Sequence, residues 1–190
     1  MYEDKELVQR ALQGEKKAFE MIIQKYQTPL SSYIARMVKE YELALDITQE
    51  VFVKAYSSLR SYRQEYKFNT WLFKIASNTV IDYWRKKRIR AVSIDQPHEM
   101  GDESLPHQIP ADEPSVLRTV ELSEVRDRIE SVLDRLPENL KELFVWRHVN
   151  DLSYEEMAEI KDMPVGTIKN RVFQAKEIIR KQLEEKRWTA

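Results

Sequence analysis

Apolar residues recur at spacings of three and four through most of the chain, which is typical of amphipathic helices. Sustained alternation of the kind that β-strands show is missing from the sequence. The pattern predicts helices over residues 4–13, from Ala18 to Tyr26, from Pro29 to Val38, and over residues 42–59, 71–90, 117–136, 139–149, 154–161 and 165–183. The expected fold class is therefore all-α.

One segment interrupts this pattern. Residues 93–114 contain four prolines, and from Asp95 to Pro114 there are six acidic residues and neither lysine nor arginine. Such a segment buries too little apolar surface to fold alone. We therefore predict two small helical domains, residues 1–92 and 117–190, joined by a flexible, acidic, proline-rich linker over residues 93–116.

Composition narrows the classes of function. The 190 residues include no cysteine and only three histidines, none at metal-ligand spacing, so we expect no disulfide, no metal site and no cofactor. No apolar run approaches the roughly 20 residues that span a bilayer, and charges interrupt the N-terminus, so we expect a soluble, cytoplasmic protein. The net charge of −1 conceals a basic segment. Residues 67–90 contain seven basic residues and one acidic residue, Asp82.

Residues 152–183 are typical of two helices joined by a tight turn. Ser153 and Glu156 have capping-box spacing, which predicts a helix that starts at Tyr154, and Pro164 ends that helix and opens the next. The last helix has one apolar face (Val165, Ile168, Val172, Ala175, Ile179). The opposite face collects Thr167, Asn170, Phe173, Gln174 and Glu177, and Lys169 and Arg171 lie on its flanks. Amide and hydroxyl groups can hydrogen-bond base edges, so a helix-turn-helix is indicated. An ordinary helical hairpin with a solvated face is the alternative, and the outward Phe173 favours DNA.

The helix over residues 42–59 also carries polar groups outside its apolar seam. We expect Asp46, Gln49, Glu50, Phe52 and Val53 to lie partly outside the seam. An exposed Phe52 beside acids is typical of a helix that docks on a basic protein partner. A bundle helix with solvated acids remains the alternative.

Aromatic and basic residues alternate between residues 61 and 90. This mixture favours single-stranded DNA, because bases stack on rings and the backbone follows the positive charge. Lys74, Asn78, Asp82 and Arg85 form a polar stripe, and the loop over residues 61–68 offers a place for a flipped base. Trp71 is expected in the core, whereas for Trp84 both a core position and a DNA-binding role remain as alternatives.

Four motifs in order carry a resemblance to a known family: DITQEVFVKAY, FNTWLFKIASNTVIDYWRKK, LPENLKELFVWRHVNDLSYEEMAEI and MPVGTIKNRVFQAKEIIRKQL. The chain resembles the extracytoplasmic-function (ECF) sigma factors of bacterial RNA polymerase over nearly its whole length. The resemblance implies that the first domain is sigma region two and the second is region four. It implies a non-catalytic subunit that gives the polymerase promoter specificity and helps to open the duplex.

The resemblance also assigns residues to partners. Asp46, Gln49, Glu50 and Phe52 match the surface that docks on the clamp coiled coil of the largest polymerase subunit. The residues implied in reading and melting the minus-ten element are Tyr62, Lys67, Lys74, Asn78, Asp82, Arg85 and Lys86. Those implied in reading the minus-thirty-five element are Thr167, Lys169, Asn170, Arg171, Phe173 and Gln174. The linker matches a segment threaded toward the polymerase active site, and an anti-sigma factor is expected by analogy.

Two residues depart from the family pattern. Gln174 stands where a basic residue is common and favours adenine in a bidentate contact. Asp162 stands where the turn often has glycine, and aspartate tolerates such a backbone better than most residues. Two other classes of function remain as alternatives: a stand-alone helix-turn-helix regulator that binds duplex operators as a dimer, and an enzyme that acts on nucleic acid.

Overall fold

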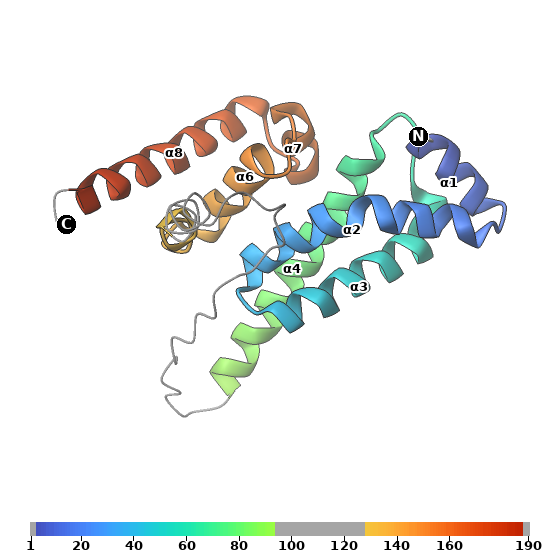
Figure 1. Cartoon of the computed structure of the whole chain (residues 1–190), viewed down its shortest axis with the longest axis horizontal. Coiled ribbons are helices and arrows are strands. Elements are labelled where there is room, and N and C mark those ends of the chain that lie inside the picture. Colours follow the sequence, from blue (N-terminus) through green and yellow to red (C-terminus); the bar gives the residue numbers. More distant parts are fainter. Residues whose placement is uncertain (1–2, 94–127, 188–190) are drawn as a thin grey trace, which may run out of the picture. The chain divides into compact units, whose positions relative to one another are not determined.

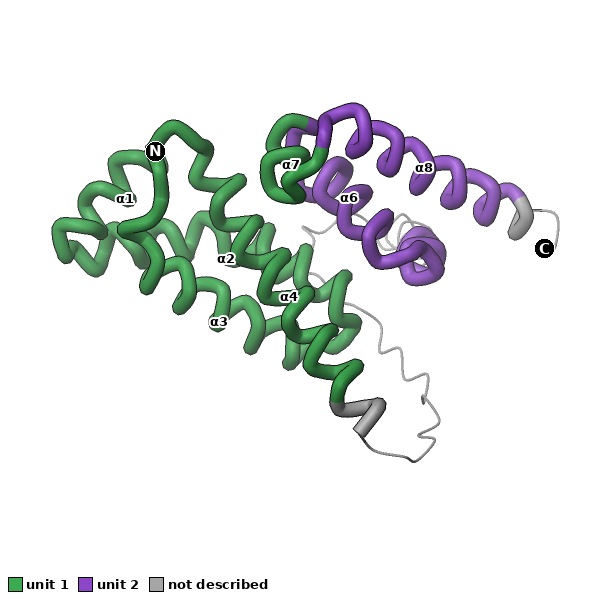
Figure 2. Tube along the Cα trace, turned by 180° about the vertical axis from the view of Figure 1, so that it is seen from behind, with its two compact units in different colours: residues 1–100, 155–163 green, residues 101–154, 164–190 purple. Residues whose placement is uncertain are grey.

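The computed structural model describes residues 3–93 and 128–187, in which every regular element is a helix (Figure 1). This confirms the predicted all-α class. The chain divides into two compact units, residues 1–100 with 155–163 and residues 101–154 with 164–190 (Figure 2). The second unit thus differs from the predicted domain 117–190, since residues 155–163 are grouped with the first unit. The predicted linker beyond residue 93, and the predicted helix up to residue 127, lie outside the described residues.

The first unit is a bundle built around one long helix. Its elements are α1 (Asp4–Leu12), α2 (Lys16–Val38), α3 (Tyr41–Ser58), the short 3-10 helix η1 (Leu59–Ser61) and α4 (Phe68–Ser93). The central helix α2 packs against α1, α3 and α4 (Figure 1). Each helix contributes its apolar stripe to a shared core, in which Val8, Ile22, Leu30, Val51 and Leu72 are completely buried.

The structure corrects the expected helix boundary at Pro29. Instead of opening a new helix, Pro29 lies inside α2, which runs without a break from Lys16 to Val38. A proline inside a helix removes one backbone hydrogen bond and costs about 3 kcal/mol. Continuing the helix keeps Ile22 before the proline and Leu30 after it in the same core, where both are fully buried. Burial on both sides of Pro29 offsets its local cost.

Within the described residues, three that are not glycine have a left-handed backbone: Lys39 (φ 64°), Asp151 (φ 55°) and Asp162 (φ 52°). Lys39 ends α2, where its N–H donates to the carbonyl of Ala35. Asp162 follows α7 (Tyr154–Lys161) and directly precedes Met163 and Pro164, after which α8 (Val165–Arg187) begins. The predicted start at Tyr154 and the predicted break over residues 162–164 are confirmed.

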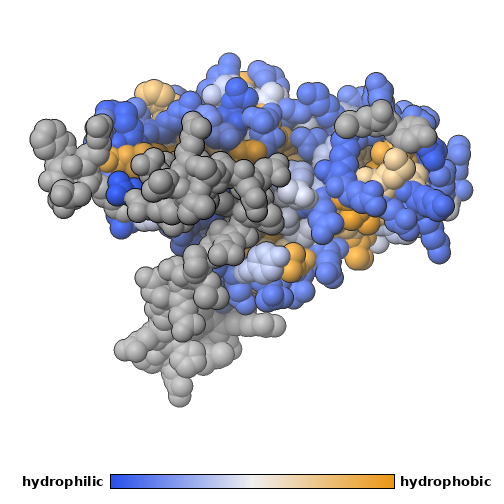
Figure 3. Space-filling model, viewed as in Figure 1, coloured by the Kyte–Doolittle hydropathy of each residue, from blue (hydrophilic) through white to orange (hydrophobic). Residues whose placement is uncertain are grey.

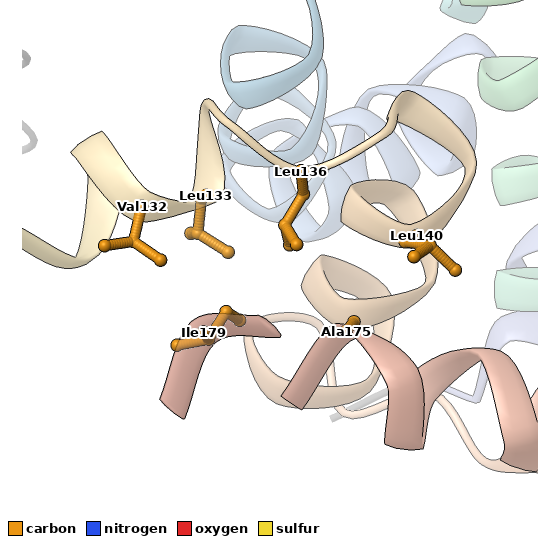
Figure 4. Packing of buried hydrophobic residues seen from close by; sticks show 6 residues of the cluster. All are labelled: Val132, Leu133, Leu136, Leu140, Ala175 and Ile179. Atoms are coloured by element: carbon orange, nitrogen blue, oxygen red, sulfur yellow. The ribbon is translucent and has the colours of Figure 1, made fainter. Parts of the chain in front are cut away.

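The second unit is held together by a compact apolar cluster. Residues 128–133 are helical, and they are followed by a turn and by α6 (Glu138–His148). Figure 4 shows the side chains of Val132, Leu133 and Leu136 directed toward Ala175 and Ile179 of α8. The apolar face that the sequence predicted for α8 is therefore its packing face, and the opposite face is left for solvent or a partner.

Candidate nucleic-acid and protein-binding surfaces

The outer face of α8 presents the side chains that the sequence predicted. Lys169, Asn170, Phe173 and Gln174 are exposed, and the Phe173 ring retains 62% of its accessible surface. Thr167 and Arg171 are half-buried at the edges of this face. An aromatic ring that is exposed beside two amides can contact a thymine methyl while the amides bond base edges. The structure thus brings the predicted residues of α8 onto one accessible face.

A tyrosine at the start of α7 lies between two cations of the second unit. The guanidinium carbon of Arg147 lies 4.9 Å from the centroid of the Tyr154 ring, and Nζ of Lys169 lies 5.6 Å from it. Arg147 also donates to the carbonyl of Leu152 at 3.1 Å. Such cation–π contacts limit the freedom of Lys169 without neutralising its charge, so its positive charge is held near the base of the outer face. Periodicity alone did not indicate this role for Tyr154.

The loop between η1 and α4, residues 62–67, packs against a cluster of aromatic rings. Tyr62, expected at the DNA surface, is only 8% exposed and packs on Phe68 and Trp71, with ring centroids 5.3 and 5.5 Å away. Its hydroxyl donates to the carbonyl of Tyr66 at 2.7 Å. Burial, followed by the negative charge of Asp4, raises the pKa of Tyr62. The ring of Tyr62 therefore stabilises the loop, whereas Tyr66, 46% exposed, offers an accessible ring that the sequence reasoning missed.

The polar stripe predicted on α4 is accessible. Lys74, Asn78, Arg85 and Lys86 are exposed, and Arg85 donates to the carboxylate of Asp82 at 2.9 Å. Lys67, in the loop before α4, has a side chain that is 74% exposed and lies 3.1 Å from a carboxylate oxygen of Glu156 in the same unit. The exposed cations Lys67, Lys74, Arg85 and Lys86 on and beside this stripe are suited to contacts with a phosphate backbone.

The two tryptophans of α4 differ in environment. Trp71 is half-buried rather than fully in the core as predicted, and its ring centroid lies 5.4 Å from that of Phe68. Trp84 is also half-buried, with Nζ of Lys87 5.7 Å from its ring centroid. The indole Nε1 of Trp84 is buried and has no hydrogen-bond partner within the described residues.

On α3, the structure contradicts the expected exposure of Phe52. Asp46, Gln49 and Glu50 are exposed as predicted, but Phe52 is 7% exposed and belongs to the core. The predicted seam was centred on Leu43, Ile47, Val51 and Ala55, whereas the buried face comprises Ala44, Ile47, Thr48, Val51, Phe52 and Ala55. The buried face thus includes Thr48 and Phe52, which the predicted seam left out, and it does not include Leu43. Val53 is exposed as predicted, and Tyr41 and Tyr56 are the other large apolar side chains exposed on α3.

Two grooves between α3 and α4 bring these predicted residues together. A groove of about 430 Å³ is lined by Val53, Lys54, Ser57, Ser58, Ile75, Asn78 and Thr79. A second groove of about 150 Å³ is lined by Leu43, Asp46, Ile47, Glu50, Thr79, Asp82, Tyr83 and Lys86. Nζ of Lys54 lies 2.7 Å from the carboxylate of Glu50 and donates to the hydroxyl of Thr79 at 3.2 Å. Acids assigned to a protein partner and groups assigned to DNA therefore share one side of the first unit.

Hydrophilic residues cover most of the described surface on the face shown in Figure 3, and apolar residues form small, separate patches. Within residues 3–93 and 128–187, no group of three or more acidic or histidine side chains could hold a metal ion. None of the helices in these segments combines the length and apolarity needed to cross a bilayer.

Two family models match the chain. Sigma-70 region 2 matches residues 22–89, which lie in the first unit, and sigma-70 region 4 matches residues 126–179, which include α6, α7 and part of α8. The chain is 34% identical over 187 residues to the ECF RNA polymerase sigma-E factor of Haemophilus influenzae, with 95% of each chain covered. It is 34% identical over 187 residues to the RNA polymerase sigma-H factor of Pseudomonas aeruginosa, with 96% of this chain and 94% of that protein covered.

Solved structures share the fold. CnrH, in complex with the cytosolic domain of CnrY, superposes with a TM-score of 0.69 at 20% identity, covering 96% of this chain and 97% of that chain. The sigma factor RpoE of Bartonella quintana, in complex with the anti-sigma factor NepR, superposes with a TM-score of 0.72 at 22% identity, covering 88% of this chain and 98% of that chain. At these identities the likeness concerns the helical fold.

Proposed function

We propose a role for each surface from one premise: the chain belongs to the ECF sigma factors of RNA polymerase. As a member of this family, it is a transcription initiation factor that directs RNA polymerase to specific promoters. It supplies sequence preference to the polymerase rather than a reaction of its own. The assignments to individual residues below are our proposals, each supported by exposure and neighbouring charge.

The outer face of α8 is proposed to read the minus-thirty-five element in the major groove. The observation that carries this assignment is the exposed Phe173 ring between Asn170 and Gln174, on the face opposite to the buried apolar cluster. Lys169 is assigned to a backbone phosphate, because phosphate contacts position a protein without reading sequence. Thr167 and Arg171 flank the base-reading residues.

The loop over residues 62–67 and the exposed stripe of α4 are proposed to bind the opened minus-ten strand. Lys74, Arg85 and Lys86 follow its phosphates, and Asn78 bonds an unpaired base. Tyr66 offers a ring for stacking, while Tyr62 supports the loop from behind. Stacking and electrostatic attraction to the backbone are the usual forces in single-strand binding.

The exposed side of α3 is proposed to dock on the clamp coiled coil of the largest polymerase subunit. Asp46, Gln49 and Glu50 supply polar and acidic contacts, as the resemblance implied. Val53 takes the apolar role that was expected of Phe52, since 66% of its surface is accessible. Interfaces commonly combine such an apolar centre with a charged rim.

A run-off transcription assay with core polymerase and a promoter library tests this function. We expect the wild-type chain to select promoters that share two elements, and Glu50→Lys to lose transcription because it reverses a charge at the docking surface. Glu20→Lys, the same charge reversal at an exposed residue of α2 outside that surface, is the matched control and should retain transcription.

Two results would contradict the proposal. Tight, specific binding to duplex sites without core polymerase, combined with full activity of Glu50→Lys, would instead support a stand-alone regulator that binds duplex operators. Nuclease activity with added magnesium would support the alternative of an enzyme that acts on nucleic acid.

An anti-sigma partner is proposed as the regulator of this chain. RpoE of Bartonella quintana, which has the same fold, was solved with the anti-sigma factor NepR. The grooves between α3 and α4 offer mixed apolar and acidic walls for such a partner. Competition between a candidate anti-sigma protein and core polymerase for the purified chain would test it, since simultaneous binding of both proteins would exclude this mode of inhibition.

A further inference from the structure

An acidic residue of α1 lies behind the loop over residues 62–67. Oδ2 of Asp4 accepts a hydrogen bond from the hydroxyl of Tyr26 at 2.6 Å, and Oδ1 lies 2.5 Å from Nζ of Lys25. The Asp4 side chain is only 24% exposed and Tyr26 is buried. Two donors on adjacent residues of α2 therefore hold one carboxylate in a fixed position. Hydrogen bonds that involve a charged group are stronger than neutral ones.

From Tyr26 a continuous series of contacts leads to the loop. The ring of Tyr26 lies 5.6 Å from that of Phe68, the first residue of α4, and Phe68 packs edge-on against Tyr62. Tyr62 in turn donates its hydroxyl to the carbonyl of Tyr66 at the far side of the loop. Figure 1 shows α1 close to η1, from which the loop departs. The negative charge of Asp4 also contributes to the raised pKa of Tyr62, so it acts at the loop as well as at Tyr26.

We propose that α1 braces the base-reading loop, with Asp4 and Tyr26 as positioning residues for minus-ten recognition. Ring-on-ring packing alone leaves freedom to slide, whereas the hydroxyl–carboxylate bond is directional and fixes the Tyr26 ring against Phe68. Neither residue touches DNA in this assignment, since Tyr26 is buried. Asp4 lies before residue 22, where the match to sigma-70 region 2 begins. The inference rests on the proposed role of the loop in reading an unpaired strand.

The test uses holoenzyme made from the full chain and core polymerase. Its templates are fork-junction promoters, chosen from the promoter library, whose minus-ten bases are single-stranded and either preferred or scrambled. The specificity ratio is the affinity for the preferred template divided by that for the scrambled one. We expect Tyr26→Phe, which removes only the hydroxyl, to lower this ratio about tenfold, the factor expected from loss of one hydrogen bond to a charged group. Asp4→Asn keeps the shape but not the charge and should give an intermediate ratio.

Glu15→Gln is the matched control. It weakens the exposed hydrogen bonds of 2.9 and 2.6 Å between Arg10 and Glu15, in the same α1–α2 region but without contact to the loop. This variant should keep the wild-type ratio. Affinity for core polymerase and discrimination at the minus-thirty-five element, measured on the same samples, should stay within about twofold of wild type for all three variants, because none of the three residues lies on α8 or on the proposed docking surface of α3.

The possible outcomes separate the brace from the proposed function. If wild-type holoenzyme does not distinguish preferred from scrambled single-stranded bases, the loop does not read them and the proposed function fails. If it does distinguish them but Tyr26→Phe keeps the full ratio, the brace is wrong. If the variants lose core-polymerase binding and both template affinities in parallel, together with a lowered melting temperature, Asp4 and Tyr26 are purely structural and the brace is also wrong.

Discussion

The candidate DNA surfaces of the two units are built in different ways. On α8, all the proposed reading residues lie on one helix face, opposite to a packed apolar cluster. In the first unit, the surface combines α4 with the loop over residues 62–67, and a cluster of packed aromatic rings sets the position of that loop. A surface on one helix follows from a period of 100° per residue, whereas an assembled surface depends on how the helices pack. We therefore expect substitutions at the surface of the first unit to change both the free energy of unfolding and DNA binding more often than substitutions on the outer face of α8.

The largest effect is expected from Phe52→Ala on α3. Because Phe52 is buried, we expect its removal to lower the free energy of unfolding by about 3–5 kcal/mol, through lost burial and the cavity left behind. Urea denaturation followed by circular dichroism measures this change. A loss below about 1 kcal/mol would show that Phe52 is accessible after all.

Val53→Ala is the neighbouring control for that experiment. Val53 is exposed, so stability should change by no more than about 0.5 kcal/mol. Affinity for core polymerase should nevertheless fall, because Val53 is the proposed apolar centre of the docking surface. Unchanged affinity would remove Val53 from the interface.

On α8, Asn170→Ala is expected to change base preference rather than stability. We expect a cost of about 1–3 kcal/mol at particular positions of the minus-thirty-five element, as for loss of a direct base contact. Lys169→Ala, on the same exposed face, should instead weaken binding nearly uniformly and reduce its salt dependence. Binding of holoenzyme to a set of single-base promoter variants distinguishes the two patterns. A uniform loss for Asn170→Ala would make Asn170 a phosphate contact.

A smaller effect is expected for Asn78→Ala on α4. The exposed Asn78 amide is assigned to an unpaired base. Its loss should therefore raise the activation free energy of open-complex formation by about 1 kcal/mol, the usual net value of a hydrogen bond. Closed-complex affinity should change less. Stopped-flow fluorescence with a labelled promoter follows the two steps separately, and equal losses in both would exclude a role in melting.

The smallest expected effect is a dependence of stability on pH through His148 in the second unit. Burial, followed by the positive charges of Lys176 and Arg147, lowers the pKa of His148 below its ordinary value of 6.5. The unfolded chain therefore takes up this proton more readily, and the free energy of unfolding should fall as the pH drops below about 6.5 and level off below the folded-state pKa. Urea denaturation of wild type and His148→Asn at about pH 7.5 and about pH 5.5 measures the difference. The asparagine variant should lose less stability on acidification, and an equal loss would show that other groups are responsible.

The sequence predicted most of the elements and the surface of α8, because these depend on residues near one another in the chain. Capping at Ser153 and the break at Pro164 gave the bounds of α7, and the apolar period gave the buried face of α8. The errors arose where tertiary packing decided the result. Pro29 stayed inside α2 because both halves of that helix pack into one core.

Phe52 and Tyr62 were predicted to lie at binding surfaces but are buried, and the reason is again tertiary packing. Their neighbours in sequence did not reveal that the buried face of α3 includes Phe52, or that Tyr62 packs on Phe68 and Trp71. The hydrogen bond from Tyr26 to Asp4 joins residues 22 positions apart, and helical periodicity carries no information about it.

The left-handed backbone at Lys39 has a practical consequence for engineering. A residue with a side chain pays roughly 1–2 kcal/mol for this conformation, whereas asparagine adopts it more readily and glycine without steric cost. Glycine would also loosen the unfolded chain, which makes asparagine the better replacement. Lys39 is exposed and belongs to none of the proposed binding surfaces. The junction between α2 and α3 is therefore a place where a more heat-resistant variant could be obtained while promoter choice is left unchanged.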